Sequence, residues 1–295
     1  MKKLLLILLI SSVGCAQNEG TINSAGSKLY YRTFGAGKPL LIINGGPGMN
    51  SNGFVSIAQT LSDHYKTILY DQRGTGKSTL EKSDSTTITM DLMVADMENL
   101  RTALHIDKWS ILGQSFGGML AAYYATKHPE HIDRIVMSSS GGIDLGLLSN
   151  GNLIVEKLNK TQRDSLDYWN AKIAAGDNSF ATRLGRGRAL APAYLYNKKN
   201  VPTIAQRLTE SNQQINGLVW QDMQRIKFNC APMLKNYKKP VLILQGKNDI
   251  LPVSIAEKIH DAFPNSQLLL LDKCAHYGWL DAPDQYLKAV NNFLN

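Results

Sequence analysis

Short apolar segments recur along the chain and alternate with longer segments of helical periodicity. The apolar segments have the length of strands. They lie at residues 29–34, 40–43, 67–70, 109–112, 134–137, 241–244 and 267–271. Continuous apolar runs of this kind are typical of strands that are buried on both faces, as in a parallel sheet.

Helical periodicity fills the intervals between these segments. Residues 90–104 repeat Met, Val and Leu at spacings of three and four, and Thr89 stands where a helix N-cap is expected. Residues 116–126, 255–263 and 286–293 have similar helical patterns. The alternation of strand and helix predicts an α/β fold with a mostly parallel twisted sheet and right-handed crossovers.

The alternation stops between residues 144 and 234. This stretch is polar, helix-like and interrupted by Gly176, Gly185, Gly187, Pro192 and Pro202. We therefore predict a helical cap at 144–234, inserted into a core formed by residues 28–143 and 235–295.

The N-terminus has the pattern of a bacterial secretory signal. Lys2 and Lys3 precede an apolar run over residues 4–10, which is too short to span a bilayer. The sequence before Cys15 resembles the cleavage site of bacterial lipoproteins, although Ser12 stands where that site usually has Leu. We predict a signal peptide at 1–14, lipid attachment at Cys15 and a polar tether over 15–27. The protein would then be anchored in the cell envelope and face outside the cytoplasm, with a periplasmic or secreted protein as the alternative.

Composition narrows the class of protein and its partners. The chain has 295 residues, of which 43% are apolar and 19% charged, so it is neither collagen-like nor disordered. The net charge of +8 is spread along the chain without the interleaved aromatic residues of a nucleic-acid reader. We expect no nucleic-acid partner, and membrane contact only through the lipid.

Cysteine and histidine are too sparse to form a framework or a metal centre. Besides Cys15, only Cys230 and Cys274 remain, and we expect both to be free thiols. We found no Cys and His cluster with the spacing of metal ligands, so we predict no metal and no cofactor.

Residues 113–117 read Gly-Gln-Ser-Phe-Gly, the pattern G-x-S-x-G. The pattern follows a predicted strand and precedes a predicted helix, which is the context of a nucleophile elbow. Glycine at both ends allows a sharp turn that exposes the hydroxyl of Ser115. We predict that Ser115 is a catalytic nucleophile.

In this architecture the nucleophile is followed along the chain by the acid and then by the histidine. His276 lies in a loop after the last predicted strand and is the expected base, whereas His260 lies within a helix. Asp249 follows the preceding strand and is the expected acid, with Asp272 and Asp281 as rivals. Asp249 would orient the imidazole and stabilise its cation.

Acyl transfer also requires backbone donors for the developing oxyanion. One is the N–H of Phe116, directly after the nucleophile. The second is expected in the glycine-rich loop at residues 44–48, at Gly46 or alternatively at Gly45.

Several motifs together resemble an α/β-hydrolase of the proline iminopeptidase family. They are Asn44-Gly-Gly-Pro-Gly48, Asp71-Gln-Arg-Gly74 with Gly76 and Ser78, Gly113-Gln-Ser-Phe-Gly117, Gly246-Lys-Asn-Asp249 and His276. The resemblance covers residues 28–143 and 235–295, and it implies that the insertion is the cap of that family. Its nucleophile, acid and base carry over to Ser115, Asp249 and His276.

The resemblance implies release of an N-terminal residue, often proline, from a peptide. Enzymes of the family hold the free amine with carboxylates, and some have Glu directly after the acid, where this chain has Ile250. The cap offers Glu210 and Asp222 as acids. Four aromatic residues of the cap could line an apolar pocket or pack within the cap, namely Trp169, Tyr194, Tyr196 and Trp220.

We therefore expect a serine hydrolase that works through an acyl-enzyme on a small peptide or acyl substrate. An aminopeptidase is the leading expectation, and Glu210, Trp169 and Trp220 are its candidate substrate-binding residues. The alternatives are an esterase, thioesterase or carbon–carbon bond hydrolase of the same fold, and a non-catalytic binding protein on a hydrolase scaffold.

Overall fold

The computed structural model describes residues 17–149 and 151–295. The predicted signal peptide and Cys15 lie outside the described residues. Among the helices of the described part, none is both long and apolar enough to cross a membrane.

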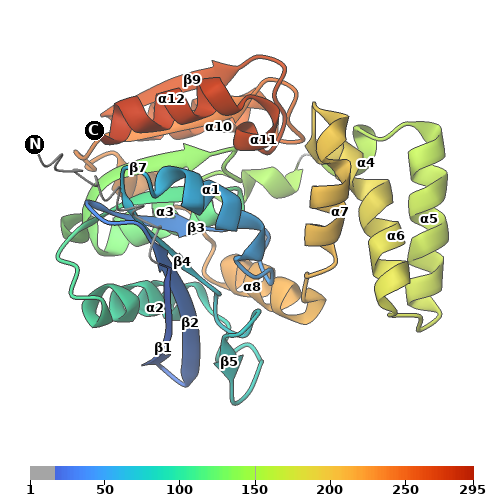
Figure 1. Cartoon of the computed structure of the whole chain (residues 1–295), viewed down its shortest axis with the longest axis horizontal. Helices are drawn as coiled ribbons and strands as arrows, with labels where there is room; N and C mark the ends of the chain where they lie inside the picture. Colours follow the sequence, from blue (N-terminus) through green and yellow to red (C-terminus); the bar gives the residue numbers. More distant parts are fainter. Residues whose placement is uncertain (1–16, 150) are drawn as a thin grey trace, which may run out of the picture.

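A twisted, mostly parallel sheet forms the centre of the molecule (Figure 1). Its strands are β1 (Asn18–Ser24), β2 (Ser27–Phe34), β3 (Pro39–Ile43), β4 (Lys66–Tyr70), β5 (Thr79–Leu80), β6 (Trp109–Gln114), β7 (Ile132–Ser138), β8 (Val241–Gly246) and β9 (Ser266–Leu271). They are ordered β1-β2-β4-β3-β6-β7-β8-β9, and β5 pairs with β2. From β4 to β9 the pairings are parallel, whereas β1, β2 and β5 join by antiparallel pairings. The seven strands expected from the sequence are all present in this sheet.

The first strand corrects the expectation of a tether over residues 15–27. Residues 18–24 form β1, which pairs along its whole length with β2. The hairpin turns at Ala25 and Gly26, which both have positive φ angles. Polar side chains concealed this strand, because it lies at the edge of the sheet where most of its residues are exposed or half-buried.

Helices cover both faces of the sheet and create two apolar cores. Successive strand residues point to opposite faces. Leu41 and Ile43 of β3 therefore join the first core, and Leu40 and Ile42 join the second. The first core is covered by α2 (Met90–Ala103), α3 (Phe116–Lys127) and α10 (Val253–Ala262), and the second by α1 (Val55–Leu61) and α12 (Pro283–Leu294). As expected, Thr89 caps α2 by accepting a hydrogen bond from Leu92 N–H.

The residues between β7 and β8 are helical. They form α4 (Leu153–Glu156), α5 (Lys160–Ala174), α6 (Phe180–Leu190), α7 (Val201–Leu208), α8 (Gln213–Arg225), α9 (Ala231–Leu234) and three short 3₁₀ turns. Helices α5 and α6 pair at the end of the molecule far from the sheet, while α7 and α8 lie nearer to it (Figure 1). We call α4–α8 the cap, because it covers the edge of the sheet at which the parallel strands end.

Candidate active site

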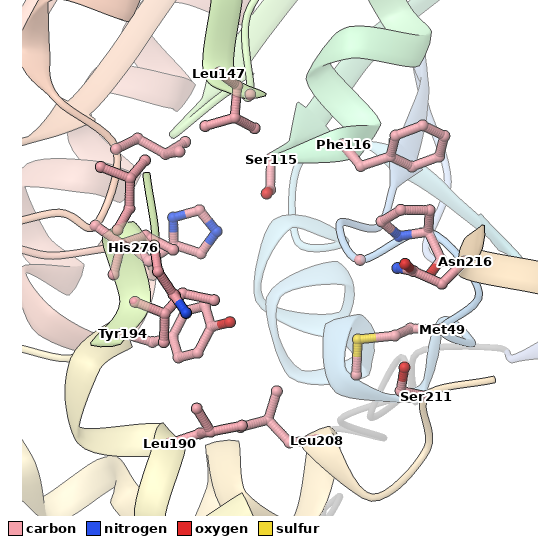
Figure 2. Close-up of a pocket in the computed structure, with 18 of the residues that line it drawn as sticks. Met49, Ser115, Phe116, Leu147, Leu190, Tyr194, Leu208, Ser211, Asn216 and His276 are labelled. Carbon is pink, nitrogen blue, oxygen red and sulfur yellow. The ribbon is translucent and has the colours of Figure 1, made fainter. Parts of the chain in front are cut away.

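Ser115 stands in a strained turn between β6 and α3. Its φ angle of 55° and ψ of −118° lie outside the usual regions for a residue with a side chain. Glycine is required on both sides of it. A Cβ at Gly113 would clash with the carbonyl of Gly117, and one at Gly117 would clash with the carbonyl of Ile43. This close packing holds Ser115 at the carboxyl edge of the sheet, where its hydroxyl faces a cavity (Figure 2).

His276 and Asp249 form a buried pair beside that cavity. The Nδ1 atom of His276 lies 2.8 Å from Oδ1 of Asp249, and each residue is only 3% exposed. The same carboxylate accepts hydrogen bonds from Leu251 N–H at 3.2 Å and from Gln245 Nε2 at 3.0 Å. These bonds fix the carboxylate, so the imidazole is oriented through Nδ1 and its Nε2 remains for other chemistry.

Gln245 was missed by the sequence analysis. It is the single polar residue in the otherwise apolar run Val241-Leu-Ile-Leu-Gln245 of β8, and it is 1% exposed. A buried amide needs hydrogen-bond partners, so its position next to the Gly246 turn could have indicated a role beside Asp249.

The other residues considered as acid or base make hydrogen bonds or ion pairs away from the Asp249–His276 pair. Asp281 accepts backbone hydrogen bonds from Ala275, Tyr196 and Asn197. Asp272 is exposed and pairs with Lys247 at 2.7 Å. His260 is exposed on α10 and bonds Ser266. Of the candidates named from sequence, Asp249 is thus the carboxylate that meets His276.

The glycine-rich loop after β3 approaches Ser115 closely. Gly46 and Gly48 have φ angles of 72° and 80°, which other residues rarely adopt. Asn44 braces the loop, since its Nδ2 donates to the carbonyls of Gly45 and Met49 at 3.1 and 3.0 Å. Gly46 and Phe116, the two predicted oxyanion donors, line the same cavity as Ser115 and His276.

The cavity has a volume of about 650 Å³ and lies between the sheet edge and the cap. Apolar side chains from both parts form much of its wall (Figure 2). They include Met49, Leu147, Leu190, Tyr194, Leu208 and Trp220. Burial raises the pKa of Tyr194 far above its usual value, so this phenol is a neutral group of the wall.

The three residues predicted to bind substrate are placed differently. Trp220 lines the cavity, as expected. Trp169 instead packs inside the cap, where a Cβ at Gly185 would collide with its ring. Glu210 lies two residues after the end of α7, where burial raises the pKa of its carboxyl while Arg207 lowers it. Among the described residues, neither Trp169 nor Glu210 belongs to the cavity lining.

Few charges face the cavity. Arg207 and Arg186 from the cap contribute cations, and Asp167 of α5 contributes a carboxylate that is exposed. Asp222, the other cap acid considered from sequence, instead accepts from Met90 N–H and pairs with Arg225 at 2.6 Å. A substrate in this cavity therefore meets more positive than negative charge from the protein.

A second group of titratable residues lies outside this cavity. Glu98, His128 and His131 place potential metal-ligand atoms within 4.8 Å of one another, which the sequence spacing did not predict. The Glu98 carboxylate already accepts two hydrogen bonds from Arg101 and one from Tyr124. Burial raises its pKa, but these bonds dominate and lower it to about 2. With a guanidinium on the carboxylate, the group is best described as an ion-pair cluster that stabilises the fold.

Cys230 and Cys274 are both free and buried, as expected from sequence. Burial raises the pKa of each thiol to about 12, so neither is a thiolate nucleophile at neutral pH.

A family model for the alpha/beta hydrolase fold matches residues 38–283. The chain belongs to the α/β-hydrolase family. Its curated relatives include the proline iminopeptidase of Heyndrickxia coagulans, which is 26% identical over 94% of this chain and 98% of the relative. The proline iminopeptidase of Saccharolobus solfataricus is 25% identical over 94% of this chain and 92% of its own length.

Solved structures support the same fold with other activities. A 2-hydroxy-6-oxo-6-phenylhexa-2,4-dienoate hydrolase from Rhodococcus superposes with a TM-score of 0.76 at 18% identity, covering 95% of this chain and 99% of that one. An esterase from Exiguobacterium antarcticum gives a TM-score of 0.71, also at 18% identity, over 92% and 98%. The fold of this α/β hydrolase is therefore shared with peptidases, esterases and carbon–carbon hydrolases.

Proposed function

We propose that this α/β hydrolase is a serine hydrolase that forms an acyl-enzyme on Ser115. Ser115 Oγ attacks the substrate carbonyl carbon, and its proton passes to His276 Nε2. The tetrahedral oxyanion accepts hydrogen bonds from the N–H groups of Gly46 and Phe116. Collapse of this intermediate breaks the bond to the leaving group, which takes the proton from His276.

Deacylation repeats these steps with water. His276 takes a proton from water, the hydroxide attacks the ester carbonyl of the acyl-enzyme, and Ser115 leaves with that proton restored. Asp249 stays ionised and stabilises the imidazolium in both halves of the reaction.

One observation carries this proposal above the others. The His276–Asp249 pair at 2.8 Å and the strained Ser115 come from three distant segments, yet they meet at one cavity. A plain structural role for a buried imidazole and carboxylate would not require a half-buried serine in a strained backbone at the same cavity.

We propose release of an N-terminal residue such as proline from peptides as the activity, because the relatives that cover most of the chain are proline iminopeptidases. The N-terminal proline of such a peptide is a small ring with a secondary amine, and this ring can pack against the apolar wall formed by Met49, Leu208 and Trp220. Asp167 is the carboxylate of the cavity lining that we propose for the substrate amine.

The charge of the cavity favours a second candidate, hydrolysis of an ester or of a carbon–carbon bond. The residue after Asp249 is Ile250, which is 8% exposed and lines the cavity, so this position offers no carboxylate to an amine. Arg186 and Arg207 would repel a cationic substrate. A neutral or anionic acyl group meets no such repulsion.

We also propose that the protein is lipid-anchored through Cys15 and faces outside the cytoplasm. The support is the sequence pattern before Cys15. Cys15→Ser should move the full-length chain from the membrane fraction to the soluble fraction, and a membrane-bound variant would refute the anchor.

The activity is tested with protein that starts at residue 17, so that the predicted signal peptide and lipid are absent. A fluorophosphonate probe should label wild type and should not label Ser115→Ala, whereas an unlabelled wild type would favour a non-catalytic binding protein. Three substrates then separate the candidates: a proline chromogenic amide, its N-acetylated form and a short acyl ester. Turnover of the free-amine amide alone indicates an aminopeptidase, and turnover of the ester alone indicates the second candidate.

A further inference from the structure

The loop that carries Gly46 is held by the cap as well as by the core. Three of its backbone carbonyls accept hydrogen bonds from residues of α7, α8 and the turn between them. They are Gly45 from Arg207 Nη2 at 2.8 Å, Gly48 from Asn212 N at 2.8 Å, and Pro47 from Asn216 Nδ2 at 2.9 Å.

The bond to Gly45 has a direct consequence for the oxyanion donor. The carbonyl of Gly45 and the N–H of Gly46 belong to one planar peptide unit. The described residues contain no cis peptide bond, so these two groups point in opposite directions. A donor that fixes the Gly45 oxygen therefore also fixes the direction of the Gly46 N–H.

The donor is a charged group, which adds a second effect. A guanidinium makes a stronger hydrogen bond to a carbonyl than a neutral amide does. By drawing electron density toward the Gly45 oxygen, it polarises the peptide and makes the Gly46 N–H a better donor.

Arg207 has little freedom to move away from this position. It is 4% exposed, and its guanidinium carbon lies 4.9 Å from the centre of the buried Phe54 ring. It also requires glycine at position 53, since a Cβ there would be 2.7 Å from Arg207 Cδ. Among the described residues the hydrogen bonds of the Arg207 guanidinium go to backbone carbonyls of this segment, from Nη2 to Gly45 at 2.8 Å and from Nη1 to Asn50 at 3.5 Å.

We propose that Arg207 is a positioning residue that orients and polarises the Gly45–Gly46 peptide, and thereby makes the cap a working part of the oxyanion hole. The inference rests on the proposed serine-hydrolase function. It assigns to α7 a role in the chemical step, beyond covering the cavity.

The test compares Arg207→Met and Arg207→Lys with wild type on the best substrate of the panel above. Arg183→Met is the control, because Arg183 is a half-buried arginine of the cap that donates to the backbone carbonyl of Asn178, away from the glycine-rich loop. Loss of a whole oxyanion donor costs about 10²–10³ in kcat, so misorientation of one should cost about 10–100-fold. On an uncharged substrate, which does not respond to the loss of the Arg207 charge from the cavity, we expect this loss in Arg207→Met with KM changed by less than about 2-fold, since the interaction forms in the transition state.

An inhibitor pair separates this role from a general loss of structure. A trifluoromethyl ketone forms a tetrahedral oxyanion on serine, whereas the matching methyl ketone binds as a ground-state mimic. Arg207→Met should weaken the trifluoromethyl ketone by the same factor as kcat and leave the methyl ketone unchanged. Arg207→Lys, which retains one charged donor, should restore part of both losses.

Kinetics of Arg207→Met that match those of Arg183→Met would overturn the inference, as would equal weakening of both ketones. If Arg207→Met does not fold, the comparison is made with the folded Arg207→Lys variant. Weaker binding of the trifluoromethyl ketone than of the methyl ketone, each relative to wild type, then supports the inference, and equal weakening overturns it. Absence of probe labelling in wild type refutes the proposed function itself, whereas labelled wild type with indistinguishable variants refutes only the role of Arg207.

Discussion

Replacing Gly45 with alanine tests how closely the glycine-rich loop must approach Ser115, the proposed nucleophile. Gly45 does not need a left-handed backbone, so alanine is permitted there by its φ angle. The obstacle is space. A Cβ at this position would lie 2.7 Å from Ser115 Cβ and 2.8 Å from the backbone oxygen of Gln114.

The size of the effect follows from these contacts. Carbon atoms that are not bonded approach to about 3.5–4.0 Å, so the loop must retreat by roughly 1 Å. A displacement of that size at a reacting centre costs about 10²-fold in rate. Overpacking of this kind lowers the free energy of unfolding by about 1–3 kcal/mol. We therefore expect Gly45→Ala to remain folded and to lose about 100-fold in kcat.

Gly217→Ala is the matched control. Gly217 lies on α8, and no atom stands within 4 Å of the Cβ that alanine would add there. Alanine stabilises a helix by about 0.5–1 kcal/mol relative to glycine, so this variant should unfold at a slightly higher temperature and keep its activity.

The measurements are steady-state turnover of the best substrate and thermal unfolding of both variants. A kcat of Gly45→Ala within about 3-fold of wild type would show that the loop can move freely, and would refute the close-approach reasoning. A loss of kcat in Gly217→Ala would show that the effect is not specific to the loop.

Three further predictions concern carboxylates that are paired with cationic side chains. Asp249→Asn should lower kcat by about 10⁴-fold, because an amide cannot stabilise the imidazolium; a loss below about tenfold would refute its role as the acid of the triad. Asp96→Asn should lower the free energy of unfolding in denaturant by about 3–5 kcal/mol, because it strands the guanidinium of Arg73, which is 2.7 Å away and fully buried; a change within error would contradict this. The pKa of Glu98 falls from its usual 4.5 to about 2, mainly through Arg101. Its contribution is therefore complete above pH 4.5 and lost toward pH 2, so unfolding curves of wild type and Glu98→Gln should converge over that range, and a constant difference would refute the linkage.

The local pattern of the sequence was sufficient for seven of the strands and for the sharp turn at Ser115. Strand and helix periodicities depend on which side chains share a face, and that is a property of neighbouring residues. Ser115 could be predicted for the same reason, since its turn needs Gly113 and Gly117 at fixed positions. Strand β1 was missed because an exposed edge strand carries no apolar pattern.

Contacts between distant segments were decided only by the tertiary structure. The sequence left three aspartates as candidate partners of His276. In the structure Asp249 lies beside His276, whereas Asp281 accepts hydrogen bonds from backbone N–H groups. Trp169 and Trp220 both lie in cap helices, and the sequence does not distinguish them. The arrangement of the helices places Trp220 at the cavity and packs Trp169 inside the cap.

The clearest case is the bond between Arg207 and Gly45, which joins residues 162 positions apart. Helix α7 is amphipathic, and its periodicity places Arg207 on the same face as Ile204 without indicating which group the guanidinium meets. Its role arises because the fold buries the side chain against a carbonyl, and burial makes a charged hydrogen bond much stronger than it is in water. The sequence by itself thus determined the elements and the candidate chemistry, while the tertiary structure decided which side chains act on one another.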